Sequence, residues 1–207
     1  MMSDEQTRRV RAAYTAETIT VYQAYAAPIA DAAVRAGTFV PPFSRDRMTW
    51  IKPSFGWMMH RSGWAGQPGQ ERILAIEISR DGFEWALAHS CLSHFTPGQH
   101  ASREAWAAAM AAAPVRIQWD PDRSLTGTRL ARRAIQIGLS GDAVHRYADE
   151  WIRSLRDITA TVHRIGQLVR AGRVAEASEG LPAERDYPLD LALVRLIGAD
   201  PAAAEAR

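Results

Sequence analysis

The sequence predicts an α+β domain, in which a small mixed or antiparallel sheet is flanked by helices and followed by a helical C-terminal section. Three observations support this fold class. Residues 17–25 and 115–121 alternate between two kinds of side chain and are rich in β-branched residues, which is typical of strands. Residues 28–36 show helical spacing instead, so strands and helices follow one another along the chain. From Gly141 onward, the apolar residues recur at helical spacing only.

The composition is that of one globular domain. The chain has 207 residues, of which 47% are hydrophobic and 23% charged, so it can bury a sizeable core. We expect a single domain over residues 1–207, with an α+β core over 14–140, a helical section over 141–180 packed on it, and an extended segment and tail over 181–207. The net charge of +2 shows no basic tail of the kind that nucleic-acid-binding proteins carry, but it does not exclude RNA as a partner.

The cysteine and histidine content indicates a reducing compartment and no metal site. Cys91 is the only cysteine, so the chain forms no internal disulfide and no multi-thiolate metal site. His89, His94 and His100 are five and six residues apart, a spacing that does not bring ligands onto one helix face. The N-terminal segment lacks the apolar stretch of a signal peptide, and no apolar run is long enough to cross a bilayer. We therefore expect a cytoplasmic protein without a membrane partner.

The first part of the chain predicts two strands, each followed by a helix. In the strand over residues 17–25, Ile19, Val21, Gln23 and Tyr25 share one face. The next helix begins at Pro28 and ends at Gly37.

A second, short strand over residues 46–52 places Met48, Trp50 and Lys52 on one face, and Pro53 ends it. Ser54 then caps a helix over 55–61.

The middle of the chain predicts a buried strand followed by two helices and two strands. Residues 72–79 are nearly all apolar, which indicates a central strand buried on both faces. A helix over 81–92, with Asp81 as its N-cap, and another over 102–113 follow. The strands over 115–121 and 132–140 are joined by a polar turn.

The end of the chain predicts helices and then an extended segment. The first helical stripe comprises Val144, Tyr147, Trp151 and Leu155, and a second helix carries the apolar residues of 162–169. Residues 180–189 contain two prolines and should run extended over the surface, and 199–207 should form a frayed tail.

Lys52 is the first candidate for a ligand-binding residue. It is the only lysine among 25 lysine and arginine residues. An Ala- and Arg-rich coding bias can leave one lysine by chance, but a compact ammonium also fits where a guanidinium does not. Lys52 and Ser54 lie at a strand end and a helix N-terminus, where free N–H groups attract anions, and Arg61 follows on the same helix. This junction predicts a phosphate or carboxylate site.

Two further candidates are polar residues within predicted strands. Gln23 either faces a cleft or is a buried amide that needs partners. Arg116, Gln118 and Asp120 share a strand face, beside Arg133 and Gln136 of the next strand; this face is either solvated or part of a site. Asp120 is its only carboxylate that can act as a base or orient a cation.

The tryptophans of residues 50–64 allow two interpretations. Trp50, Trp57 and Trp64 can stack on a nucleobase, or they can belong to the core, which the helical spacing favours for Trp57. The sequence contains no Gly-x-Gly-x-x-Gly, P-loop or Gly-x-Ser-x-Gly motif, which argues against the common nucleotide-binding and hydrolase folds.

The chain resembles domain-of-unknown-function family 4291 over nearly its whole length. The resemblance rests on segments such as "VYQAY", "RMTWIKPSFGWMMHRSGW", "QERILAIEIS" and "LPAERDYPL", of which the block over residues 48–62 is the longest and most specific. This family carries no settled activity.

At the level of the fold, the order of elements is similar to ADP-ribosyltransferase-like domains, which hold NAD in a cleft between two small sheets. The resemblance implies a split sheet, with Tyr22 and Gln23 in the first motif and Ser54 in the second. The third motif matches Gln118 and Asp120, where those domains usually supply a glutamate.

The resemblance therefore implies an NAD-dependent ADP-ribosyltransferase with NAD as cofactor. Gln23 and Ser54 would hold the nicotinamide side, and Lys52 would neutralise the pyrophosphate. Asp120, with Gln118, would stabilise the cationic ribose. The other expected cofactor-binding residues are Tyr22, Tyr25, Trp57 and Arg61.

The alternative is a nucleotide- or RNA-binding protein without catalysis. Its Trp-rich segment would stack on bases, and Arg47, Lys52 and Arg61 would contact phosphates.

Overall fold

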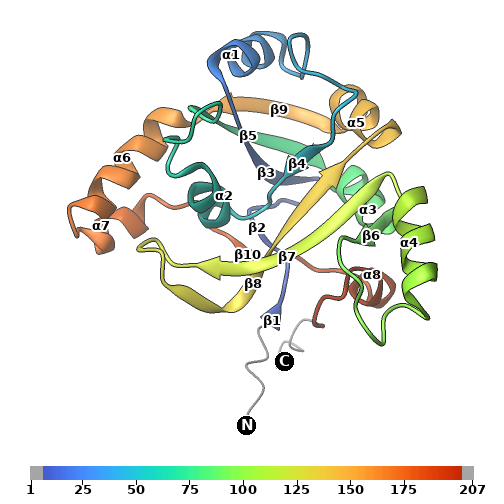
Figure 1. Cartoon of the computed structure of the whole chain (residues 1–207). Helices are drawn as coiled ribbons and strands as arrows, with labels where there is room; N and C mark the ends of the chain where they lie inside the picture. The colour runs from blue at the N-terminus through green and yellow to red at the C-terminus, as the bar shows by residue number, and fades with distance from the viewer. Residues whose placement is uncertain (1–6, 202–207) are drawn as a thin grey trace.

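The computed structural model describes residues 7–201 and confirms the α+β fold class with a split sheet (Figure 1). Each of the two main sheets is built around one long central pairing. An antiparallel sheet has the order β3 (Thr18–Tyr25), β5 (Arg72–Ser79), β9 (Ile152–Asp157). A mixed sheet has the order β1 (Thr7–Arg8), β8 (Arg129–Leu139), β7 (Val115–Arg123), β6 (Ser90–Leu92), and β4 (Thr49–Ile51) also pairs with β8. A third ladder pairs β2 (Arg11–Ala12) with β10 (Arg185–Asp186).

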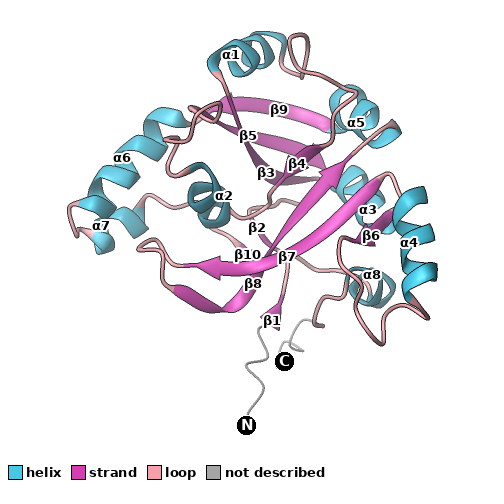
Figure 2. Ribbon diagram, in the orientation of Figure 1, coloured by secondary structure: helices cyan, strands magenta, loops and turns pink. Residues whose placement is uncertain are grey.

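Helices flank both sheets (Figure 2). They are α1 (Ala27–Ala36), α2 (Phe55–Ser62), α3 (Arg80–Ala88), α4 (Arg103–Ala112), α5 (Asp142–Arg146), the π-helix η1 (Tyr147–Trp151), α6 (Thr159–Arg170), α7 (Val174–Glu179) and α8 (Leu191–Ile197). Helix α2 contacts β3 of one sheet and β7 of the other, and it therefore lies where the two sheets approach each other.

The predicted starts and ends of the first two helices are confirmed. Helix α1 has proline in its first turn and ends at Gly37, whose φ of 71° is the left-handed conformation that glycine adopts without a steric penalty. Helix α2 begins after Ser54, whose side chain accepts a hydrogen bond from the backbone N–H of Trp57. The short strand ahead of Pro53 is confirmed as well.

The antiparallel sheet is buried on both faces. Ile19 and Val21 of β3 belong to a large core cluster that also contains Ile117 and Ile137 of the mixed sheet. Tyr22 points to the other face, into a second cluster formed mainly with α2, α6 and α7. The nearly continuous apolar sequence of β5 follows from this two-sided burial, as predicted.

The predicted helix over 81–92 is wrong at both ends. Ser79, not Asp81, caps α3, and its hydroxyl accepts a hydrogen bond from the N–H of Gly82. The helix ends at Ala88, and residues 90–92 form β6, which pairs in parallel with β7. The local sequence of residues 90–92 looks like a continuation of the helix. These residues form a strand because the free edge of β7 provides their backbone partners.

The sequence predicts a helical C-terminal section, and this prediction is wrong in part because the section contains a strand. The stripe of Val144, Tyr147, Trp151 and Leu155 is buried, but its last member lies on β9 rather than on a helix. Central strand β5 has two edges, and β9 supplies the second backbone partner that β3 alone cannot. The extended segment also contains β10, and α8 follows it. Residues 202–207 of the predicted tail lie outside the described residues.

Candidate functional site

Lys52 lies where the chain crosses from one sheet to the other. Residues Thr49–Ile51 pair with β8 of the mixed sheet. The next residue, Lys52, instead exchanges two backbone hydrogen bonds with Tyr22 of β3, with N···O distances of 2.7 and 3.2 Å. Pro53 then ends the pairing, because proline has no N–H to donate. The short strand thus places the Lys52 side chain at the junction between the two sheets.

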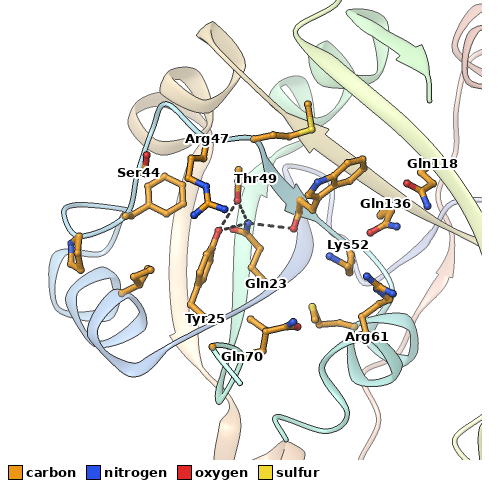
Figure 3. A pocket seen from close by; sticks show the side chains of 18 residues that line it. Gln23, Tyr25, Ser44, Arg47, Thr49, Lys52, Arg61, Gln70, Gln118 and Gln136 are labelled. Carbon is orange, nitrogen blue, oxygen red and sulfur yellow. Dashed lines mark hydrogen bonds between the residues drawn. The ribbon is translucent and has the colours of Figure 1, made fainter. Parts of the chain in front are cut away.

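A cleft of about 690 Å³ opens at this junction (Figure 3). Three of the side chains that line it are cationic and none is a carboxylate, whereas the whole chain is close to neutral. Arg47 lies near one end of the cleft, and Lys52 and Arg61 lie together toward the other. The polar lining residues are Gln23, Tyr25, Ser44, Arg47, Thr49, Lys52, Arg61, Gln70, Gln118 and Gln136. This excess of positive charge attracts anions.

Lys52 is a buried cation without a partner. The residue is only 7% exposed, and within the described part of the chain its ammonium forms no hydrogen bond or ion pair. Burial, and to a lesser extent the charge of Arg61, lowers the pKa of Lys52 from 10.5 to about 8, and the charge of Asp120 opposes this change. The ammonium is therefore still mostly protonated at pH 7. A buried charge of this kind is costly unless something pairs with it.

Gln23 is a buried amide whose polar atoms are all used within the protein. Its Oε1 accepts a 2.7 Å hydrogen bond from the hydroxyl of Tyr147. Its Nε2 donates to Tyr25 at 2.9 Å and to Thr49 at 2.6 Å. Of the two interpretations that the sequence allowed, Gln23 combines both: it lines the cleft, but its hydrogen bonds go to neighbouring side chains. Its role is to hold Tyr25 and Thr49 in place.

Gln118, Asp120 and Gln136 form a second polar cluster at the end of the cleft near Lys52. Gln118 and Gln136 are directly opposite each other on β7 and β8. The Nε2 of Gln118 donates to one oxygen of Asp120 at 2.9 Å, and the Nε2 of Gln136 donates to the other at 2.6 Å. The two glutamines line the cleft, while Asp120 lies behind them.

Three of the predicted site residues lie away from the cleft. Tyr22 is 3% exposed and packs edge-on against Phe55 in the second core cluster. Trp57 is 5% exposed, so burial leaves it no face on which a base could stack. Ser54 caps α2 and lines a different, smaller pocket. The structure brings the remaining predicted residues together. Five of them line one cleft: Gln23, Tyr25, Lys52, Arg61 and Gln118. Asp120 accepts hydrogen bonds from two glutamines of the lining.

Sequence reasoning missed several residues of the site. Thr49 and Tyr147 complete the network around Gln23, and Tyr147 comes from a segment far along the chain. Gly138, which lies under two side chains of the cleft lining, is another such residue. A Cβ at Gly138 would lie 3.0 Å from the Trp50 ring and 2.9 Å from the sulfur of Met48. Glycine is the residue that lets these two side chains cover β8 and form the apolar wall of the cleft.

His89, Cys91, His94 and His100, for which the sequence predicts no metal site, all lie among the described residues. Within residues 7–201, no group of three or more His, Cys, Asp or Glu side chains is arranged to hold a metal ion. No helix of the same described range is both long and apolar enough to cross a membrane.

A protein-family model matches most of the chain. The model of a family described as "Domain of unknown function (DUF4291)" matches residues 9–187 of the chain. Among curated proteins, none matches.

Proposed function

The chain belongs to the DUF4291 family, whose description assigns no activity, and we propose that its cleft binds NAD and transfers ADP-ribose from it. The observation that carries this proposal is Lys52, a buried residue whose ammonium has no hydrogen-bond or ion-pair partner in the described chain and which lines a cleft free of carboxylates. A phosphate group would supply the missing negative charge.

The size and lining of the cleft suit a nucleotide. A volume of about 690 Å³ lies within the range of pockets that hold small molecules and cofactors. Lys52 and Arg61 would share the negative charge of a pyrophosphate, and Trp50, Tyr25 and Phe43 provide apolar surface for a flat ring. A ligand with two phosphates would balance most of the positive charge in the lining.

In the proposed reaction, the bond between the ribose C1′ and the nicotinamide nitrogen breaks, and nicotinamide leaves as a neutral molecule with the bonding electron pair. Positive charge then develops on the ribose, and a nucleophile of the acceptor bonds to C1′ and loses its proton. The carboxylate of Asp120 lies behind Gln118 and Gln136, and its negative charge would stabilise that cation through the two amides. No group in the described lining resembles a catalytic glutamate, so Asp120 is the anion that this proposal requires.

The RNA-binding alternative has less support. It depends on a tryptophan-rich stacking surface, but Trp57 is buried. The volume of the cleft is also that of a small-molecule site.

The test is calorimetric titration of the protein with NAD, ADP-ribose and a short single-stranded RNA. Lys52→Met removes the charge and keeps an unbranched apolar side chain that is one atom shorter, so we expect affinity for both nucleotides to fall about 10- to 100-fold, as loss of a charged hydrogen bond predicts. Lys52→Arg keeps the charge but places a wider group at the junction, so affinity should fall less. Arg164→Met, on an exposed face of α6, is the matched control and should bind normally.

The reaction is tested separately, by release of nicotinamide from NAD in the presence and absence of candidate acceptors. Equal affinity of wild type and Lys52→Met for every ligand would contradict the proposed binding site. Normal NAD binding without any nicotinamide release would support the proposed binding site and refute the proposed transfer reaction. A binding affinity that falls steeply with rising salt concentration, together with RNA as the tightest ligand, would favour the alternative function.

A further inference from the structure

The orientation of two glutamine side chains in the cleft is fixed by their shared partner. A carboxylate oxygen accepts hydrogen bonds and donates none, so a glutamine that contacts it must present its NH₂ group. Gln118 and Gln136 each contact a different oxygen of Asp120, at 2.9 and 2.6 Å. Both amides are therefore turned with nitrogen toward Asp120, and both carbonyl oxygens point away from it.

The two carbonyl oxygens have no partner in the described chain. Within residues 7–201, the only side-chain hydrogen bonds of Gln118 and Gln136 are those to Asp120. Neither oxygen is among the fully buried atoms without a partner, so both keep solvent-accessible surface. Both residues line the cleft, side by side in cross-strand register, close to Lys52 (Figure 3). This end of the cleft thus presents a pair of hydrogen-bond acceptors.

The opposite end of the cleft has a different character. Gln23 is saturated by Tyr25, Thr49 and Tyr147. The hydroxyls of Tyr25 and Thr49 lie 2.6 Å apart, so one donates to the other and the second keeps its proton free. Burial raises the pKa of Tyr25 to about 12, so that proton stays on the pair at neutral pH. One end of the cleft therefore offers a donor and the other offers two acceptors, with the Lys52 ammonium beside the acceptors.

We infer that the carbonyl pair of Gln118 and Gln136 binds the vicinal hydroxyls of a sugar whose phosphate is held by Lys52 and Arg61. Two neighbouring hydroxyls carry two O–H donors that diverge from adjacent carbons, so each can reach one carbonyl of a cross-strand side-chain pair, whereas a phosphate oxygen has no proton to donate there. Asp120 is a positioning residue in this arrangement, because it touches the amides and not the ligand. The inference deepens the proposed function and rests on it, since it names the part of the ligand that this wall recognises.

The experiment compares two probes that both contain a pyrophosphate group, ADP-ribose and inorganic pyrophosphate, of which only ADP-ribose also carries sugar hydroxyls and an adenine ring. In Asp120→Asn, an NH₂ group replaces one carboxylate oxygen, and one glutamine must turn its carbonyl inward to meet it. We expect affinity for ADP-ribose to fall about tenfold and affinity for pyrophosphate not to fall, because the variant removes a negative charge that acts on Lys52. Gln118→Met and Gln136→Met remove one carbonyl each at similar length and should show the same selective loss, so the test does not depend on Asp120→Asn folding well.

Gln167→Met, on the exposed face of α6, is the matched control and should bind both probes normally. Equal losses for the two probes in Asp120→Asn, or unchanged ADP-ribose affinity in both glutamine variants, would overturn the inference, as would wild-type protein that binds ADP-ribose no more tightly than pyrophosphate. Failure of wild type to bind pyrophosphate would overturn the anion site of the proposed function and this inference with it. Selective ADP-ribose binding without nicotinamide release would refute only the transfer reaction.

Discussion

Replacing Lys52 with methionine should make the protein more stable. Burial lowers the pKa of Lys52 from 10.5 to about 8, and each pH unit of that difference corresponds to about 1.4 kcal/mol. The folded state therefore carries a cost of about 3 kcal/mol at pH 7 from the partial loss of hydration of this ammonium and from its repulsion by Arg61. Lys52→Met removes the charge and keeps the apolar stem, so no cavity forms. We expect its free energy of unfolding to rise by up to about 3 kcal/mol, which is roughly 6–12 °C in Tm for a chain of this size.

The pH dependence gives a sharper form of the same test. Below pH 8 the lysine is protonated in both the folded and the unfolded states, so its cost is present in full. Between about pH 8 and 10.5 the unfolded state binds more protons than the folded state, and the stability of wild type rises with pH relative to Lys52→Met. The advantage of the variant should therefore shrink over this interval and be nearly gone above it.

The assay is urea unfolding of wild type, Lys52→Met and Lys52→Arg at pH 7, 9 and 10.5, without added nucleotide. The arginine variant keeps a charge that does not titrate in this range, so it should gain no stability. A methionine variant that is less stable than wild type at pH 7, or a difference that is the same at all three pH values, would refute the reasoning. Gain of stability with loss of pyrophosphate binding would identify Lys52 as a residue retained for its ligand.

Three further predictions concern the surrounding fold. Gly138→Ala should lower stability by about 1–3 kcal/mol and shift the fluorescence of Trp50, because its Cβ would lie 3.0 Å from the indole ring; unchanged emission and Tm would contradict this packing. Burial raises the pKa of Glu184 from 4.5 to about 7, so wild type should lose stability as pH rises from about 4.5 to 7. Glu184→Gln, which can still accept from the N–H of Phe55, should lack that loss and be the more stable protein at pH 8 by thermal melting; parallel pH profiles would contradict it. A fragment that ends at residue 140 lacks strand β9 and should not unfold cooperatively in a calorimeter, whereas a sharp transition would show that the core folds alone.

The elements near the site could be predicted from the sequence because their signals are local. Pro53 and Ser54 mark a strand end and a helix start whatever the rest of the chain does, and the structure confirms both. The alternation of β7 likewise showed which residues face the core. Segments 90–92 and 152–157 were assigned wrongly because their strand structure depends on a free edge elsewhere in the fold. A local pattern carries no information about such a distant partner.

The composition of the site was predictable in part, for a similar reason. Lys52 stood out because its residue type is unique in the chain, and Gln118 and Asp120 because their strand face is polar. Tyr147 could not be found, since it lies on a helix that only the fold brings to Gln23. Ser54 is predicted both to cap α2 and to contact the ligand; the structure confirms the cap and places Ser54 beside a different pocket.

The polarity of the cleft follows from which of its amides are already satisfied. Gln23 and Gln136 are both buried glutamines on strands, and the sequence gives no means of telling them apart. The nitrogen of Gln23 donates to two hydroxyls and its oxygen accepts from a third, so no hydrogen-bonding group of this amide is left for a ligand. Gln136 meets a carboxylate, which uses its nitrogen only and leaves its oxygen for the cleft. Replacing Asp120 by a hydroxyl-bearing residue would remove this distinction, which is why the carboxylate matters to the site although it does not line the cleft.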